Sequence, residues 1–252
     1  MRRLAWLLGL LLAGACCKTP PPPAAPAPRP DAAAASAAMV HDPAHPPIDC
    51  PLRKQGIVTE GMKPFEQVEK YIEFLERPDR ALWQKPDAVV QALGLKGDEV
   101  VADLGAGSGY FTFRLAQVLP LGRVIAIDLE PEMLRHIHHQ AMASGAKNVE
   151  VRAARPEDPN VPEGMGRVFV CDVLHHVQDR EAWLAKLAGE VQPGTRLTVI
   201  EFKEGELPEG PPAALKLPRQ RIVELLAAAG FDLVADKPDL LPYQTFLEFR
   251  RR

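Results

Sequence analysis

Short apolar runs alternate with segments of helical spacing from about residue 65 to the end of the chain. Runs of only a few apolar residues are typical of buried strands, whereas apolar residues that recur every three or four positions indicate helices. This alternation predicts an α/β domain with a parallel sheet. The predicted strands cover residues 100–103, 123–127, 148–153, 167–171, 196–201, 231–235 and 245–250. The predicted helices cover residues 65–75, 86–93, 110–119, 180–191 and 218–229, with another that begins at Glu130.

The first predicted strand ends in Asp103 and passes into a turn with glycine at alternate positions, Gly105, Gly107 and Gly109. Glycine tolerates positive φ and carries no Cβ, so a ligand can lie directly on the main chain of such a turn. A dinucleotide fingerprint needs a glycine at position 110, where Tyr110 stands, and a phosphate-binding loop needs a Gly-Lys-Ser/Thr ending that is absent. The spacing of the glycines therefore favours neither a dinucleotide nor a phosphate group as the ligand.

An acidic residue two positions before a G-x-G-x-G turn resembles motif I of the class I S-adenosylmethionine-dependent methyltransferases. The resemblance implies S-adenosyl-L-methionine as the cofactor, with Asp103 paired to its ammonium directly or through water. Asp128 ends the second strand, where a carboxylate can bind the ribose hydroxyls. The cofactor-binding residues implied in this way are Asp103, Gly105, Ala106, Gly107, Gly109, Asp128, Leu129, Asp158 and Asp172.

The order of the elements also resembles this family, over roughly residues 65–252. It implies a doubly wound, mostly parallel seven-stranded sheet, a Rossmann-like methyltransferase fold closed by a C-terminal hairpin. Right-handed crossovers would place the tips of the first two strands at one edge of that sheet. The segment 51–95 resembles a helical cap at the cofactor end, which gives Trp83, Gln84 and Lys85 a possible place at the pocket; alternatively, Trp83 packs the cap on the core.

The fourth predicted strand is followed by D-V-L-H-H-V, which resembles the motif IV region between cofactor and acceptor in this family. His175 or His176 has a pKa range suited to a general base for an oxygen or nitrogen acceptor. Alternatively, one histidine packs beneath the next helix and the other bonds to main chain. A further alternative is that the rate comes from placing the acceptor in line with the activated methyl group, in which case no base is needed.

The third strand lacks the aspartate that often follows it in the family and contacts the adenine. Ala154 stands near that place, so a backbone amide or Asp158 would serve instead. No metal site is predicted, because His136 and His139 have no cysteine or carboxylate at ligand spacing.

Composition narrows the choice of partners. The chain has 252 residues, a formal net charge of -3 and a pI near 6.2, so it lacks the basic surface typical of nucleic-acid partners. Its four cysteines lack C-x-x-C spacing, so the sequence indicates neither a zinc knuckle nor a disulfide framework. A small-molecule acceptor is the expected partner, and the oligomeric state stays open.

The N-terminal segment differs from the rest. Arg2 and Arg3 precede an apolar run at 4–15 that is too short to span a bilayer and is typical of an export signal. The run ends in L-A-G-A-C-C, which resembles a bacterial lipoprotein box with Cys16 as the lipidated residue. The predicted organisation is a leader at 1–17, a Pro/Ala-rich tether at 18–50, the cap at 51–95 and the cofactor-binding domain at 96–252.

The resemblance implies transfer of a methyl group to a nucleophilic O, N, C or S of a small or medium-sized acceptor. The leader predicts a lipoprotein tethered to a membrane of the cell envelope, with a cytoplasmic enzyme as the alternative. Since the cofactor is made in the cytosol, an exported domain could instead be a catalytically inactive methyltransferase-like module that binds an adenosine-containing or other small ligand. Tyr110 disfavours a nicotinamide-dependent oxidoreductase.

Overall fold

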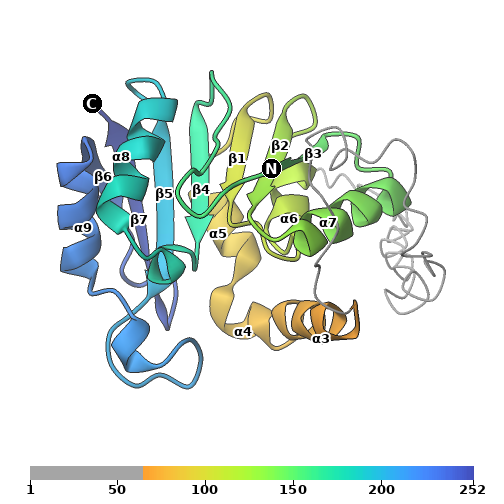
Figure 1. Cartoon of the computed structure of the whole chain (residues 1–252), viewed down its shortest axis with the longest axis horizontal. Coiled ribbons are helices and arrows are strands. Elements are labelled where there is room, and N and C mark those ends of the chain that lie inside the picture. The colour runs from red at the N-terminus through yellow and green to blue at the C-terminus, as the bar shows by residue number, and fades with distance from the viewer. Residues whose placement is uncertain (1–64) are drawn as a thin grey trace, which may run out of the picture. The chain divides into compact units, whose positions relative to one another are not determined.

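A computed structural model of the chain describes residues 65–252. Seven strands form one sheet in the order β3-β2-β1-β4-β5-β7-β6 (Figure 1), parallel from β3 to β5 and antiparallel at β7 and β6. The predicted seven-stranded, mostly parallel fold is confirmed. The strands are β1 Val100–Leu104, β2 Arg123–Asp128, β3 Val149–Ala153, β4 Arg167–Cys171, β5 Arg196–Phe202, β6 Phe231–Asp236 and β7 Gln244–Arg251.

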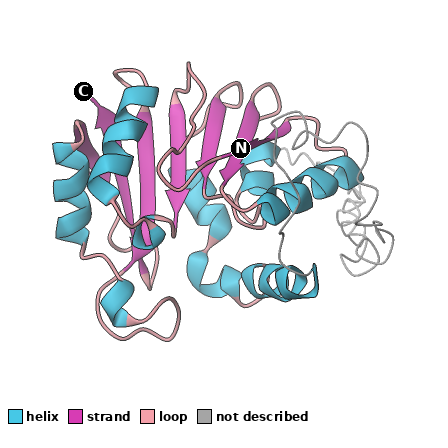
Figure 2. Ribbon diagram, in the orientation of Figure 1, coloured by secondary structure: helices cyan, strands magenta, loops and turns pink. Residues whose placement is uncertain are grey.

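Helices connect the consecutive parallel strands, except between β3 and β4 (Figure 2). The helix predicted at 110–119 is shorter, because Tyr110 and Phe111 still belong to the turn and Val118 already leaves the helix. The helices are α3 Phe65–Leu75, α4 Arg80–Gln84, α5 Pro86–Ala92, α6 Thr112–Gln117, α7 Pro131–Ser144, α8 Arg180–Glu190 and α9 Arg219–Ala228, with 3-10 turns η1 Leu174–His176 and η2 Ala213–Leu215.

The central strands bury both faces, which explains why they read as continuous apolar runs rather than alternating ones. In β2, Val124 and Ala126 pack in clusters with residues of α6 and α7, whereas Ile125 and Ile127 pack in the cluster that contains residues of α8 and α9. Successive side chains of a strand point to opposite faces, so one apolar strand supports two helical layers.

The connection between β3 and β4, residues 154–166, contains no helix. A hollow of about 750 Å³ opens here, lined by Arg123, Glu150 and Arg152 among others. Arg123 of β2 and Glu150 and Arg152 of β3 lie on the face of the sheet opposite α7. They border this hollow, because no crossover helix covers them.

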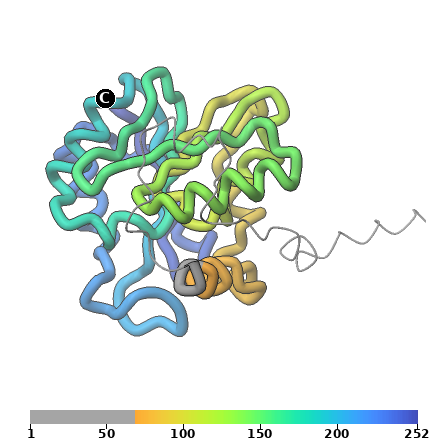
Figure 3. Tube along the Cα trace, turned by 45° about the vertical axis from the view of Figure 1, so that its right-hand side comes forward, coloured from red at the N-terminus to blue at the C-terminus, as the bar shows by residue number. Residues whose placement is uncertain are grey.

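The helices α3, α4 and α5 form the described part of the predicted cap. Figures 1 and 3 show α3 and α4 at the same end of the sheet as the loop 203–218. Arg77, between α3 and α4, forms an ion pair with Glu209 in that loop. The predicted leader with Cys16, the tether at 18–50 and the start of the cap lie outside the described residues. Within 65–252, no helix has the length and apolar character needed to cross a bilayer.

Candidate functional site

The glycine turn lies at the carboxyl end of β1, as predicted. Gly105, Gly107 and Gly109 all have positive φ, at 74°, 56° and 88°. The amides of Gly105 and Ala106 donate to the carbonyl of Ile127 at 2.7 and 3.1 Å, which ties the turn to the end of β2. L-residues rarely adopt such φ values, so the backbone itself requires glycine here.

The three glycines differ in what surrounds them. A Cβ added at Gly105 would lie 2.2 Å from Cγ2 of Val173, and one added at Gly109 would lie 2.9 Å from Phe113. At Gly107 the nearest atom would be Cδ1 of Leu75 at 3.6 Å. Gly105 and Gly109 therefore serve close packing, whereas Gly107 presents main chain beneath the cap.

Asp128 lies beside this turn. Its Oδ2 accepts from the amide of Gly107 at 2.8 Å, and its Oδ1 accepts from the amide of Glu130 at 2.9 Å. Burial raises the pKa of Asp128, while these two backbone hydrogen bonds oppose the rise. Each carboxylate oxygen keeps a second lone pair, so Asp128 can accept further bonds from ribose hydroxyls.

Asp103 is buried at the end of β1, where its Oδ2 accepts from Thr112 Oγ1 at 2.6 Å. Burial raises the pKa of Asp103 to about 7; the hydrogen bond from Thr112 opposes the rise and the charge of Asp128 adds to it. An incoming ammonium would favour the ionised form of this carboxyl group. The chemistry of Asp103 thus fits the role that the resemblance implies.

Two other predicted cofactor residues, Leu129 and Asp158, have different surroundings in the structure. Leu129 follows Asp128 and is 52% exposed, so its apolar side chain is available to a ligand. Asp158 instead lies against α8: its Oδ1 accepts from the amide of Asn160 at 2.9 Å, and Lys186 Nζ lies 3.9 Å from its Oδ2. A hydrogen bond with Glu190, also on α8, lowers the pKa of Asp158. An adenine contact by Asp158 stays a prediction.

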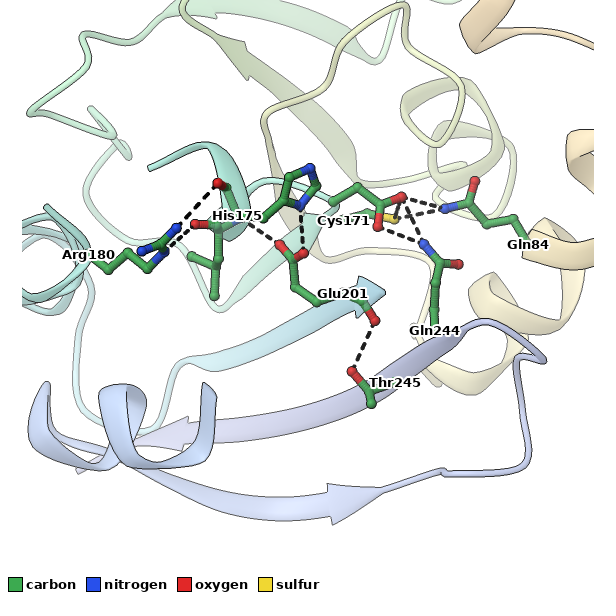
Figure 4. A network of polar contacts seen from close by, with 9 residues as sticks. Gln84, Cys171, His175, Arg180, Glu201, Gln244 and Thr245 are labelled. Atoms are coloured by element: carbon green, nitrogen blue, oxygen red, sulfur yellow. Dashed lines mark hydrogen bonds and ion pairs between the residues drawn. The ribbon is translucent and has the colours of Figure 1, made fainter. Parts of the chain in front are cut away.

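Asp172 follows β4 in a left-handed conformation, with φ of 60°. Its carboxylate accepts from Gln84 Nε2 at 3.0 Å and from Gln244 Nε2 at 2.7 and 2.8 Å. Figure 4 shows the side chains of Gln84 and Gln244 pointing toward the same carboxylate. Desolvation and then the charge of Glu201 raise the pKa of Asp172 to about 6, against the charge of Arg80 and the bond from Gln244. This network joins the cap, β4 and β7.

The two adjacent histidines have different surroundings. His175 is buried, with Nδ1 at 2.8 Å from Glu201 Oε2, and the exposed fractions of the two side chains are 5% and 1%. The other oxygen of Glu201 accepts from the amide of Leu174 at 2.6 Å, so the carboxylate is held in place (Figure 4). His176 is exposed, with its ring 4.0 Å from that of His175. Of the two histidines, His175 is thus the one whose ring contacts a carboxylate.

The pKa values of the two histidines are expected to differ. Burial alone would lower the pKa of His175, but the hydrogen bond and charge of Glu201 outweigh it and raise this pKa. Burial and the charge of His175 lower the pKa of His176. An NMR titration of ring-labelled histidines should therefore show His175 above and His176 below the ordinary value of about 6.5.

Glu201→Gln is the control for this titration, because it removes the charge and keeps the shape. The pKa of His175 should then fall, so that the imidazolium is lost at lower pH. A His175 pKa below the ordinary value in the unaltered protein would contradict the pairing with Glu201.

Among residues 65–252, no three His, Cys, Asp or Glu side chains gather in an arrangement that could hold a metal. Nε2 of His136, which the sequence places near His139, instead lies 3.2 Å from Oε1 of Glu76, the residue that follows α3. Trp83 is buried, and its ring centroid lies 5.7 Å from that of Phe202, so it packs the cap on the core.

Sequence reasoning left Arg80, Glu201 and Gln244 out of the site. A signal for Glu201 was present, because it ends a parallel strand just as Asp103 and Asp128 do. Arg80 and Gln244 carry no such signal. They come from the cap and from the antiparallel β7, which the fold brings beside the tip of β4.

The sequence resembles known methyltransferases over part of its length. Residues 101–194 match a family described as "Methyltransferase domain". An uncharacterized methyltransferase of Mycobacterium tuberculosis strain H37Rv is 31% identical over 124 residues, which are 49% of this chain and 61% of that protein. A ubiquinone/menaquinone biosynthesis C-methyltransferase of Syntrophotalea carbinolica is 25% identical over 46% of this chain and 49% of its own length. The chain thus spans about half to three fifths of these relatives.

Solved structures show the same fold. A SAM-dependent methyltransferase from Aquifex aeolicus superposes with a TM-score of 0.66 at 25% identity, over 71% of this chain and 96% of that one. Human N-acetylserotonin methyltransferase in complex with SAM gives a TM-score of 0.59 at 18% identity, over 79% and 61% of the two chains. Together, the matched domain and these relatives support the class I methyltransferase family and S-adenosyl-L-methionine as the cofactor.

Proposed function

We propose that this chain transfers the methyl group of S-adenosylmethionine to a hydroxyl or amine of a small or medium-sized acceptor. The observation that carries the proposal is the convergence of Asp103, the glycine turn, Asp128 and the His175–Glu201 pair at the carboxyl edge of one sheet. Ligands of open α/β sheets bind at this edge. The cofactor supplies a methyl group that is already activated on a sulfonium.

The residues at the glycine turn fit this cofactor. Gly107 offers main chain without a Cβ, and the carboxylates of Asp103 and Asp128 suit an ammonium and a ribose diol. Ser108, within the turn, has a buried Oγ without a hydrogen-bond partner among the described residues. A buried polar atom of this kind is commonly satisfied by a ligand or by water.

His175 suits the acceptor side. If Nδ1 carries a proton that it donates to Glu201, the neutral ring presents a lone pair at Nε2. Nε2 can then take the proton that a hydroxyl or an amine loses as it is methylated. Glu201 stabilises the imidazolium that results. A histidine base is of use only where the acceptor has a proton to lose, which disfavours a thioether. Among acceptors that have such a proton, hydroxyl and amine groups are the stronger hydrogen-bond donors to Nε2.

Asp128→Asn tests the cofactor side of the proposal. The amide would place an N–H group against the donors of Gly107 or Glu130 and weaken the contact with the ribose. Loss of such bonds costs about 2 kcal/mol, or about thirtyfold in affinity. Isothermal titration of the full chain with S-adenosyl-L-methionine measures the change.

Asp232→Asn is the matched control, because Asp232 lies in β6 at the edge of the sheet, where its Oδ1 accepts from Arg252 Nη1 at 2.8 Å. We expect its affinity to stay within about twofold of the unaltered chain, a change of under 0.5 kcal/mol. Absence of cofactor binding by the unaltered chain would overturn the proposal. An equal loss for both variants would remove Asp128 from the site.

A further inference from the structure

The first cap helix, α3, is thinly attached to the domain. Ile72 packs with Met133 of α7 and with Leu75, in a cluster separate from the main core. Tyr71 and Phe74 of the same helix remain 50% and 55% exposed. The next cap helices bury Trp83, Gln84, Val89 and Val90. Elements with few buried contacts open most readily, so α3 is the part of the cap best suited to move.

Helix α3 also covers the cofactor site. Leu75, its last residue, places Cδ1 3.6 Å from where a Cβ of Gly107 would lie. Gly107 is the glycine of the turn that presents open main chain to a ligand. A ligand on this turn would therefore lie against α3, so its binding can influence the position of α3.

Arg80 stands where α3, α4 and the turn meet. Its Nη1 donates to the carbonyl of Leu75 at 2.6 Å, and its Nε donates to Gln84 Oε1. Its guanidinium lies 4.0 Å from the ring centroid of Tyr110, the residue that follows the glycine turn. A guanidinium has five N–H donors, so these contacts leave donors for a ligand.

The charge of Arg80 reaches the carboxylates of the site. It lowers the pKa of both Asp103 and Asp172, against the effect of burial. In the proposed function, Asp103 takes the ammonium of the cofactor's methionine moiety. The carboxylate on the same carbon must then lie close by, where it needs a cation or other strong donor.

We propose that Arg80 binds the carboxylate of the cofactor's methionine moiety and thereby ties the position of α3 to cofactor occupancy. This inference rests on the proposed function. Gln84 and Tyr110 orient the guanidinium, since one accepts from Nε and the other lies against its face. The same guanidinium holds the last carbonyl of α3, so a ligand that engages Arg80 closes the cap over itself.

A pair of ligands that differ only in this carboxylate tests the proposal: S-adenosylmethionine and decarboxylated S-adenosylmethionine. Titration calorimetry of the full chain should show a preference of about tenfold or more for the intact cofactor. Arg80→Gln should reduce that preference to about twofold or less, while its affinity for the decarboxylated ligand changes little.

Arg114→Gln is the matched control. Arg114 lies at the same distance of 4.0 Å from the Tyr110 ring centroid, but its Nη1 donates to the carbonyl of Tyr110. This variant should keep the full preference for the intact cofactor. A selective loss in Arg114→Gln, or a loss for both ligands alike in Arg80→Gln, would overturn the inference. Binding of neither ligand by the unaltered chain would instead overturn the proposed function.

Hydrogen exchange provides a second readout that a purely structural role of Arg80 would not change. In the unaltered chain, the intact cofactor should slow amide exchange at residues 69–75 more than the decarboxylated ligand does. In Arg80→Gln the two ligands should protect these amides equally. Protection that is the same for both ligands in the unaltered chain would exclude the coupling between Arg80 and α3.

Discussion

Gly105→Ala is expected to lower the free energy of unfolding by about 2 to 5 kcal/mol, the sum of backbone strain of about 1 to 2 and overpacking of about 1 to 3. The φ of Gly105 is 74°, and an added Cβ would lie 2.2 Å from Cγ2 of Val173. The methyl group cannot fit unless the segment after β4 moves. Urea denaturation followed by circular dichroism measures the change.

Gly145→Ala separates strain from overpacking. Gly145 closes α7 with φ of 70°, and no heavy atom lies within 4 Å of its Cβ position. This variant should lose only the strain of about 1 to 2 kcal/mol. Val173→Ala in the Gly105→Ala background should recover part of the stability. Equal destabilisation by the two glycine variants would show that Val173 does not press on the turn.

His175→Gln is expected to lower kcat by about 10² to 10⁴, the usual contribution of a positioned base, with cofactor affinity unchanged. The assay is release of the demethylated cofactor in the presence of an acceptor found by screening. His176→Gln is the control, because His176 is exposed and Glu201 bonds to its neighbour instead. We expect that control to keep most of the activity. A His175→Gln enzyme with full kcat would show that placement of the acceptor suffices.

The His175–Glu201 pair also predicts how kcat depends on pH. His175 acts as a base only when neutral, and Glu201 raises its pKa, so kcat should rise with pH through that raised value. Glu201→Gln removes the raising charge, and the rise should therefore move to lower pH. A profile that is the same in both enzymes would contradict the assignment of the base to His175.

Local patterns predicted where much of the candidate site lies in the fold. Asp103 and Asp128 end short apolar runs, and the carboxyl ends of parallel strands meet at one edge, so their proximity follows from chain order. The glycine turn is equally local, because a positive φ favours glycine wherever it occurs. The patterns did not distinguish His175 from His176, since adjacent residues share the same local sequence and differ only in the neighbours that the fold supplies.

Tertiary structure supplied what spacing along the chain cannot encode. Glu201 reaches His175 from the end of β5, and Gln84 and Gln244 reach Asp172 from the cap and from β7. The guanidinium of Arg80 lies over the ring of Tyr110. The sequence pattern had shown only that Tyr110 stands where a dinucleotide fingerprint needs a glycine. The sequence alone therefore specified the sheet and the glycine turn at the end of β1, because both depend on periodicity and backbone conformation. The partner of the base and the contacts of the cap depend on packing between distant segments, which only the folded chain brings together.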